Sequence, residues 1–140
     1  MGKLRYAREL CGEDAAVFDL AKMKDINMND VKKMVVGKMF DARIIVNLQD
    51  GIRAMLEQGV DARAFFEKNL DRLEGKVLIC DEIGSGIVPM DPFERRWRDE
   101  TGFVCQLLAR RADVVDRVWA GLPVRLKAPA TQETEGIKDT

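Results

Sequence analysis

Two adjacent acids followed by two glycines are the residues of this chain best placed to do chemistry. Asp81 and Glu82 come directly after the apolar run Val77–Cys80, and Gly84 and Gly86 follow them. Paired carboxylates there could hold Mg²⁺, usually through water, or orient a nucleophile near a phosphate, and glycines let backbone amides approach a ligand closely. The alternative is structural: the acids are solvated at a strand end and the glycines shape a turn. The sequence leaves both interpretations open.

Three arginines further along form a second candidate. Arg95, Arg96 and Arg98 could clamp phosphates, because the guanidinium fork matches phosphate oxygens. Arg95 and Arg96 each have an acid four residues later, and Arg98 has one four residues before it. Pairs at this spacing neutralise one another on an exposed helix face. The pattern therefore favours a solvated, neutralised face over a phosphate clamp.

The first residues could be the tail of a phosphate-binding loop. In such a loop, glycine amides and a lysine cradle phosphates just before a helix, as Gly2 and Lys3 would here. The full motif needs an upstream glycine, a preceding strand, and a Ser or Thr after the lysine to reach Mg²⁺, whereas Leu4 follows Lys3. Without further context, an ordinary chain start followed by a helix explains these residues better.

Histidine is absent from all 140 residues. This absence excludes Ser–His and Cys–His nucleophiles, an imidazole base and every histidine-containing metal site. Three cysteines, Cys11, Cys80 and Cys105, are widely spaced and match neither a disulfide framework nor a paired zinc signature. We expect them to be reduced and mostly buried.

Composition and charge are those of one soluble globular domain, with 46% hydrophobic and 34% charged residues. The 23 basic and 24 acidic residues give a net charge of −1 and form no basic stripe, so we expect no nucleic acid partner. No apolar run approaches the ~20 residues that cross a bilayer, and no signal peptide is recognisable. We therefore expect a cytoplasmic protein without a membrane partner.

Hydrophobic periodicity predicts alternating helices and strands. The predicted helices are Lys3–Cys11, residues 30–57 with a break near Gly37, a segment from Asp61 to Gly75, and residues 91–111. The predicted strands are Ala15–Leu20, Val77–Cys80 and Val114–Ala120, followed by an extended piece to Lys127. This order predicts a three-layer α/β domain over residues 1–127 with a mainly parallel sheet, and residues 128–140 as a disordered tail. In such sheets ligands bind at the carboxyl ends of the strands, where Asp81 would lie.

Several segments in the second half resemble one family. Residues 81–89 look like the Asn-Glu-Val-Gly-x-Gly-Ile-Val-Pro stretch of the bifunctional adenosylcobinamide kinase and adenosylcobinamide-phosphate guanylyltransferase family of cobalamin biosynthesis. Residues 95–99 are similar to its Arg-Arg-Phe-Arg-Asp helix, and residues 120–127 to its Ala-Gly-Leu-Pro-x-x-Leu-Lys ending. The matches keep their order over residues 76–127, and with them Gly2-Lys3 looks like the end of the family's Gly-Lys-Ser loop.

The resemblance implies a P-loop NTPase-like fold, with the first strand missing from this chain. It also implies ATP or GTP with Mg²⁺ as phosphoryl donor and adenosylcobinamide as acceptor. With it, we assign catalytic roles to Glu82 and Asp81, and nucleotide binding to Gly2, Lys3, Gly84, Gly86, Arg96 and Arg98. Lys3 would contact the nucleotide phosphates, and Glu82 would lie near the metal ion or the attacking group.

The chain also departs from the family. Leu4 stands where the family has its Mg²⁺-binding hydroxyl, and Asp81 and Cys105 replace asparagines. Because the family's guanylyl transfer passes through a histidine, we predict that this chain has no guanylyltransferase activity. Three readings stay open: a kinase-only relative whose true start lies upstream, a non-catalytic nucleotide- or corrinoid-binding regulatory paralogue, and a scaffold with neither ligand. A gap left by a missing strand would favour a homo-oligomer.

Overall fold

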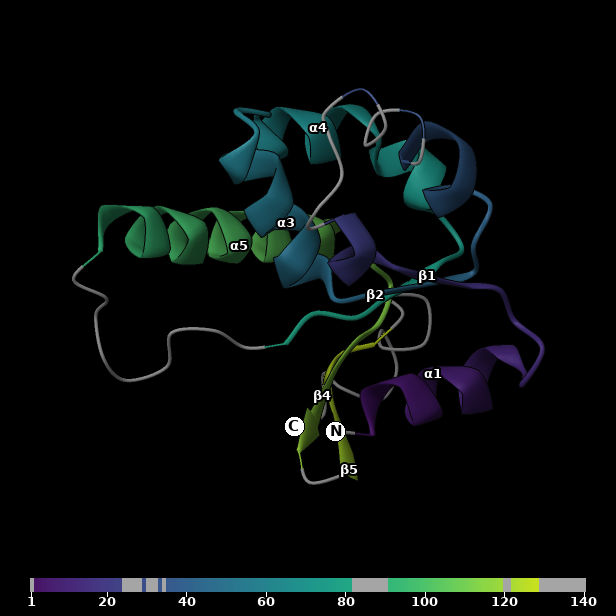
Figure 1. Cartoon of the computed structure of the whole chain (residues 1–140). Helices are drawn as coiled ribbons and strands as arrows, with labels where there is room; N and C mark the ends of the chain where they lie inside the picture. The colour runs from purple at the N-terminus through teal and green to yellow at the C-terminus, as the bar shows by residue number, and fades with distance from the viewer. Residues whose placement is uncertain are drawn as a thin grey trace.

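A parallel sheet of three short strands forms the centre of the protein. The computed structural model describes residues 2–23, 29, 33, 35–81, 91–119 and 122–128 (Figure 1). The strand order in the sheet is β1 (Val17–Asp19), β2 (Ile44–Val46) and β3 (Val77–Leu78). Ile44 of β2 pairs with Val17 on one side and with Val77 on the other, so the middle strand has neighbours along both edges.

Helices and a hairpin surround this sheet. In chain order they are α1 (Lys3–Cys11), η1 (Leu20–Met23), the π-helical turn η2 (Val35–Met39), α3 (Leu48–Glu57), α4 (Ala62–Lys68), η3 (Leu70–Leu73), α5 (Pro92–Arg111), β4 (Val115–Trp119) and β5 (Leu122–Lys127). None of the helices in the described part of the chain is long and apolar enough to span a bilayer.

The sheet is covered on both faces, which makes the fold three-layered. Successive side chains of a strand point to opposite faces. Ile44 and Val46 therefore pack toward Ala7 of α1, while Ile45 between them lies in the main core with residues of α3, α4 and α5. Figure 1 shows α1 on one side of β1 and β2, and α3 and α4 on the other. The predicted three-layer α/β fold with a parallel sheet is confirmed, whereas the missing first strand stays a prediction.

Most predicted elements are present. The helix at Lys3–Cys11 has the predicted bounds, and β1 and β3 lie inside the strands predicted at Ala15–Leu20 and Val77–Cys80. Asp91 caps α5 as its position before a proline indicates, accepting a hydrogen bond of 2.8 Å from the Phe93 amide. Of the tail predicted at residues 128–140, all but Ala128 lie outside the described residues.

The helix predicted through residues 30–57 is wrong where β2 lies. Ile44, Ile45 and Val46 are β-branched and buried, and the first two are paired on both edges, so tertiary burial outweighs the helical spacing of the surrounding residues. Asn47 separates this strand from α3 by adopting a left-handed conformation with φ 59° and ψ 47°. The single helix predicted from Asp61 to Gly75 is instead two elements: α4, which ends at Lys68, and the short 3-10 helix η3 that follows it.

Close contact between α3 and η1 sets the position of the α3 N-terminus. A Cβ added at Gly51 would lie 2.8 Å from Leu20 Cδ1, well inside normal contact. Leu20 is fully buried and follows directly on Asp19, the last residue of β1. The absence of a side chain at Gly51 thus lets the start of α3 sit against the end of β1.

The strand predicted at the end of the chain pairs with β5 in a separate antiparallel hairpin instead of joining the parallel sheet. One hydrogen bond ties this hairpin to α1, and an ion pair within the hairpin holds the carboxylate that accepts it. Tyr6 donates to Asp116 Oδ2 at 2.6 Å, and Arg125 Nε donates to Asp116 Oδ1 at 2.8 Å. These donors stabilise the charged carboxylate and hold the pKa of Asp116 below its ordinary value. The contact orients α1, the helix that carries Lys3.

Candidate functional site

A polar residue lies at or shortly after the carboxyl end of each of the three parallel strands. Asp19 is the last residue of β1, Asn47 follows β2 directly, and Asp81 comes three residues after the end of β3. Because the strands are parallel, their carboxyl ends lie together, which is where ligands bind in open α/β sheets. We call Asp19, Asn47, Gln49 and Asp81 the edge network.

Hydrogen bonds run through the edge network from β1 to β3. Asn47 Nδ2 donates to Asp19 Oδ1 at 2.7 Å. Gln49 Nε2 lies 3.4 Å from both Asn47 Oδ1 and Asp81 Oδ2, while its Oε1 accepts from the Asp81 amide at 3.0 Å. A displacement of any one of these side chains therefore affects its neighbours.

Lys3 reaches the edge network from the opposite layer. Its Nζ lies 2.7 Å from Asp81 Oδ1, in a pair whose lysine and aspartate side chains are 26% and 52% exposed. Ion pairs open to solvent contribute only about 1 kcal/mol or less. A phosphate that offers Lys3 several charged oxygens can therefore compete with Asp81 for it.

The first turn of α1 adds backbone donors beside Lys3. Gly2 is the residue before the helix, with φ 84° and ψ −7°, and no side chain caps the first amides in the described part of the chain. No acid occupies this first turn either. The N-terminal amides of a helix carry a partial positive charge and favour an anion. Lys3 and these amides together make this end of α1 attractive to a phosphate group.

Contacts from α5 hold Gln49 in place. Trp97 Nε1 donates to the backbone oxygen of Gln49 at 2.8 Å. Arg53, one turn further along α3, lies 4.8 Å from the Trp97 ring centre and 5.1 Å from that of Phe93. It also pairs with Glu94 through two hydrogen bonds of 2.6 and 3.1 Å. These contacts anchor the start of α3 to α5, at Gln49 and again one turn later at Arg53.

The residues predicted from sequence fall into three groups. The structure brings Lys3 and Asp81 into contact, with Gly2 immediately before Lys3. Glu82, Gly84 and Gly86 lie outside the described residues. Arg96 lines a separate groove, and Arg98, half-buried, does not line that groove.

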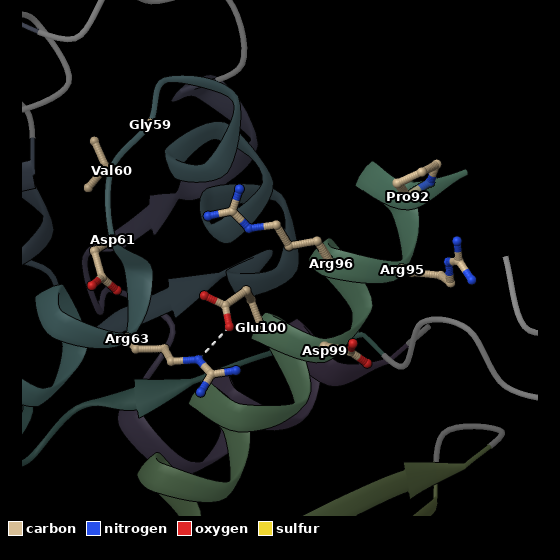
Figure 2. A pocket seen from close by; sticks show the side chains of 9 residues that line it. All are labelled: Gly59, Val60, Asp61, Arg63, Pro92, Arg95, Arg96, Asp99 and Glu100. Atoms are coloured by element: carbon tan, nitrogen blue, oxygen red, sulfur yellow. Dashed lines mark hydrogen bonds and ion pairs between the residues drawn. The ribbon is translucent and has the colours of Figure 1, made fainter. Parts of the chain in front are cut away.

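That groove lies between the start of α5 and the loop before α4 (Figure 2), with a volume of about 700 Å³. Its lining residues are Gly59, Val60, Asp61, Arg63, Pro92, Arg95, Arg96, Asp99 and Glu100. In Figure 2, Arg96 reaches toward the loop before α4 while Arg95 points the other way. Gly59 follows the end of α3, which is about 15 Å long, whereas Gln49 of the edge network is at its start. The groove and the edge network are therefore separate places.

The ion pairs expected along α5 are replaced by pairs between helices. Glu100 pairs with Arg63 of α4 instead of Arg96, and Glu94 pairs with Arg53 of α3. Arg95 and Arg96 make no ion pair with a described residue, so the predicted neutralisation by acids four residues later is wrong for both. Acids on α5 that face another helix gain a partly buried partner, which is worth more than an exposed neighbour on the same helix.

Asp19, Asn47 and Gln49 were not among the site residues predicted from the sequence. One signal was present: Asn47 is a polar residue directly after the β-branched run Ile44–Val46, as Asp81 follows the apolar run from Val77. This signal did not lead to a strand prediction, because Ile44–Val46 lies inside residues 30–57, whose apolar residues have helical spacing. Once Ile44–Val46 is a strand parallel to β3, Asn47 must lie at the same sheet edge as Asp81.

The parallel sheet and the helices on both of its faces define a three-layer α/β domain, an arrangement consistent with a P-loop-like fold. The chain belongs to the CobU family, described as cobinamide kinase / cobinamide phosphate guanyltransferase, whose model matches residues 20–126. The resemblance found in the second half of the sequence is thereby confirmed.

Two curated relatives match part of the chain. It is 41% identical over 59 residues to the bifunctional adenosylcobalamin biosynthesis protein CobP of Pseudomonas aeruginosa, covering 41% of this chain and 34% of that protein. It is 45% identical over 51 residues to the bifunctional adenosylcobalamin biosynthesis protein CobU of Salmonella typhimurium, covering 36% of this chain and 28% of that protein. The chain thus spans about a third of the length of these relatives.

Proposed function

We propose that this chain is a nucleotide-dependent kinase acting on cobinamide, and that the nucleotide phosphates bind between Lys3 and Asp81. The observation that carries the proposal is the contact of Lys3 Nζ with Asp81 at the carboxyl edge of the sheet, 2.7 Å long. Family membership supports the reaction, because the matching model is described as a cobinamide kinase. ATP or GTP would supply the phosphoryl group.

In this proposal the protein works by positioning and by stabilising charge. Lys3 and the free amides at the start of α1 would bind the phosphate oxygens. Asp81, released from Lys3 or sharing it, would orient the attacking hydroxyl of the acceptor together with Glu82. Gly84 and Gly86 would let the backbone approach the phosphates. We do not include Arg96 in this phosphate site, because it lines the groove at the other end of α3.

The carboxylates at the sheet edge could hold Mg²⁺ only together with the phosphates of a bound nucleotide. Among the residues that the structure describes, no group of three or more potential metal ligands occurs, and Leu4 offers no hydroxyl. Mg²⁺ commonly binds through one or two carboxylates together with substrate phosphates and water. Asp19 and Asp81 fit that role, so they would hold the ion jointly with the nucleotide. When bound, Mg²⁺ would neutralise charge on the phosphates.

Binding of ATP with Mg²⁺ should raise the melting temperature of the protein. A ligand at 100 times its Kd adds about 2.7 kcal/mol to the free energy of unfolding, which a thermal-shift measurement detects readily. Adenosine, which lacks phosphates, is the control and should produce no comparable shift. An equal shift with adenosine, or none with ATP or GTP, would contradict the proposed phosphate site.

Turnover separates the proposed kinase from a second function. Leu4, where a Mg²⁺-binding hydroxyl is expected, favours a regulatory relative that binds a nucleotide or corrinoid without transferring phosphate. Such a protein would show the ATP-dependent shift but would form no phosphorylated cobinamide. Formation of that product, followed by chromatography with labelled ATP, supports the kinase.

We also expect no covalent GMP adduct on this chain. The family resemblance implies that guanylyl transfer passes through a histidine, and the sequence has none. Incubation with GTP and Mg²⁺ should therefore leave the intact mass of the protein unchanged after denaturation. A mass increase equal to one GMP would show that another residue serves as nucleophile.

A further inference from the structure

Asn47 has an unfavourable backbone conformation at the carboxyl end of the central strand. Among the described residues it is the one residue other than glycine with a positive φ, in the left-handed region that L side chains adopt at a cost. An asparagine directly before a helix usually caps the first helix amides with its side chain. In the described structure Asn47 makes no such cap to α3, and its side chain instead bonds to Asp19 of the neighbouring strand.

The two carboxylates of the edge network determine the direction of its hydrogen bonds. An ionised carboxylate only accepts, so the group of Asn47 that faces Asp19 must be its NH2. The Asn47 Oδ1 then accepts from Gln49 Nε2, 3.4 Å away. Gln49 in turn presents its Oε1 to the Asp81 amide at 3.0 Å. Each side-chain amide thus has one orientation that satisfies both of its neighbours.

These bonds leave one oxygen of Asp19 for another partner. Asp19 Oδ1 accepts from Asn47 Nδ2 at 2.7 Å and from the Ala21 amide at 2.9 Å. Within the part of the chain that the structure describes, no hydrogen bond or ion pair uses Asp19 Oδ2. Two donors on Oδ1 restrict rotation of the carboxylate, so Oδ2 keeps one direction.

The backbone around Asn47 is fixed as well. Its carbonyl oxygen accepts from the amides of Asp50 and Gly51 at 3.0 and 3.2 Å, which ties it to the first turn of α3. The next amide, of Leu48, donates to the carbonyl oxygen of Ile79 just after β3, at 3.1 Å. The turn that carries the Asn47 side chain is therefore bonded to two elements besides β2.

We propose that Asn47 is a positioning residue, which orients Asp19 so that the free Oδ2 can bind the Mg²⁺ that accompanies the nucleotide. The inference rests on the proposed function and deepens it, because it names the residue that prepares one carboxylate for the ion. Asn47 acts through Asp19 and not by contact with the ion. Partners that orient a metal-binding carboxylate typically contribute roughly 10–100-fold to metal affinity.

Asn47→Gly tests the inference, because glycine adopts a positive φ without penalty and has no side-chain amide. The melting temperature of the nucleotide-free variant should stay close to that of the unaltered protein. At a fixed ATP concentration, the Mg²⁺ concentration that gives half of the ATP-dependent rise in melting temperature should increase roughly 10–100-fold. This measurement reports binding and needs no turnover.

Asn69 supplies the matched control. Its side chain donates to the backbone oxygen of Phe65 in its own helix at 2.8 Å, and within the described residues it bonds to no member of the edge network. Asn69→Gly makes the same chemical change and should leave the half-saturating Mg²⁺ concentration unaltered.

A double substitution shows whether Asn47 acts through Asp19. Asp19→Ala removes the carboxylate that Asn47 orients, so adding Asn47→Gly to that variant should change the half-saturating Mg²⁺ concentration little further. Residues in one hydrogen-bond network are expected to be non-additive in this way. Equal factors for Asn47→Gly with and without Asp19 would overturn the inference.

The single variant separates this inference from the proposed function. If Asn47→Gly left the Mg²⁺ dependence unchanged, or lowered only the melting temperature of the nucleotide-free protein, the positioning role would be wrong and the proposed function would stand. If the unaltered protein showed no shift with ATP and Mg²⁺, the proposed phosphate site would be contradicted, and the inference with it.

Discussion

Lys3→Ala should abolish detectable phosphoryl transfer from ATP and remove the ATP-dependent rise in melting temperature. Lys3 is the cation nearest Asp81 at the sheet edge, and its Nζ would contact the phosphate oxygens directly. Loss of a single preorganised group that stabilises transition-state charge typically costs roughly 10²–10³-fold in rate. Single-turnover transfer of labelled phosphate to cobinamide measures the rate, and the thermal shift measures binding.

Unfolding would not account for such a loss. The pair with Asp81 is partly exposed, so the free energy of unfolding should fall by about 1 kcal/mol or less. Arg5→Ala is the matched control, because Arg5 is a cation on the same helix whose side chain is 87% exposed. It should leave both transfer and binding unchanged. Equal effects of the two substitutions, or full activity of Lys3→Ala, would remove Lys3 from the proposed site.

Phe66→Ala should lower the free energy of unfolding by about 3–5 kcal/mol, a large part of the stability of a domain of this size. Phe66 is fully buried in the main core and meets the Phe65 ring edge-on, with ring centres 5.2 Å apart. Truncation removes its buried surface and leaves a cavity that the rigid surroundings fill only in part. Urea denaturation followed by circular dichroism measures the change.

The neighbouring ring provides the comparison. Phe65 also lies on α4, but it is only half-buried and packs at the margin of the core. Phe65→Ala should therefore cost clearly less than Phe66→Ala, because less apolar surface leaves water on folding. If both substitutions lowered stability equally, the described orientation of α4 on the core would be wrong.

Local signals determined much of this protein. Asp91 followed by proline marks the start of α5, and the apolar run from Val77 marks β3, because caps and short buried strands depend on neighbouring residues. The ordered motifs of the second half were enough to indicate the family. Asp81 was a candidate from residue type and position, whereas Lys3 became one only with the family resemblance.

The tertiary structure decided which distant residues meet. Ile44–Val46 is a strand because strands on both sides pair with it, and only then does Asn47 join Asp19 and Asp81 at one edge. The acids of α5 likewise pair with arginines of other helices, which no spacing within α5 could reveal. Strand pairing and side-chain burial depend on segments far apart in the sequence, so the chain's local pattern identifies the candidate residues and its packing assembles them into a site.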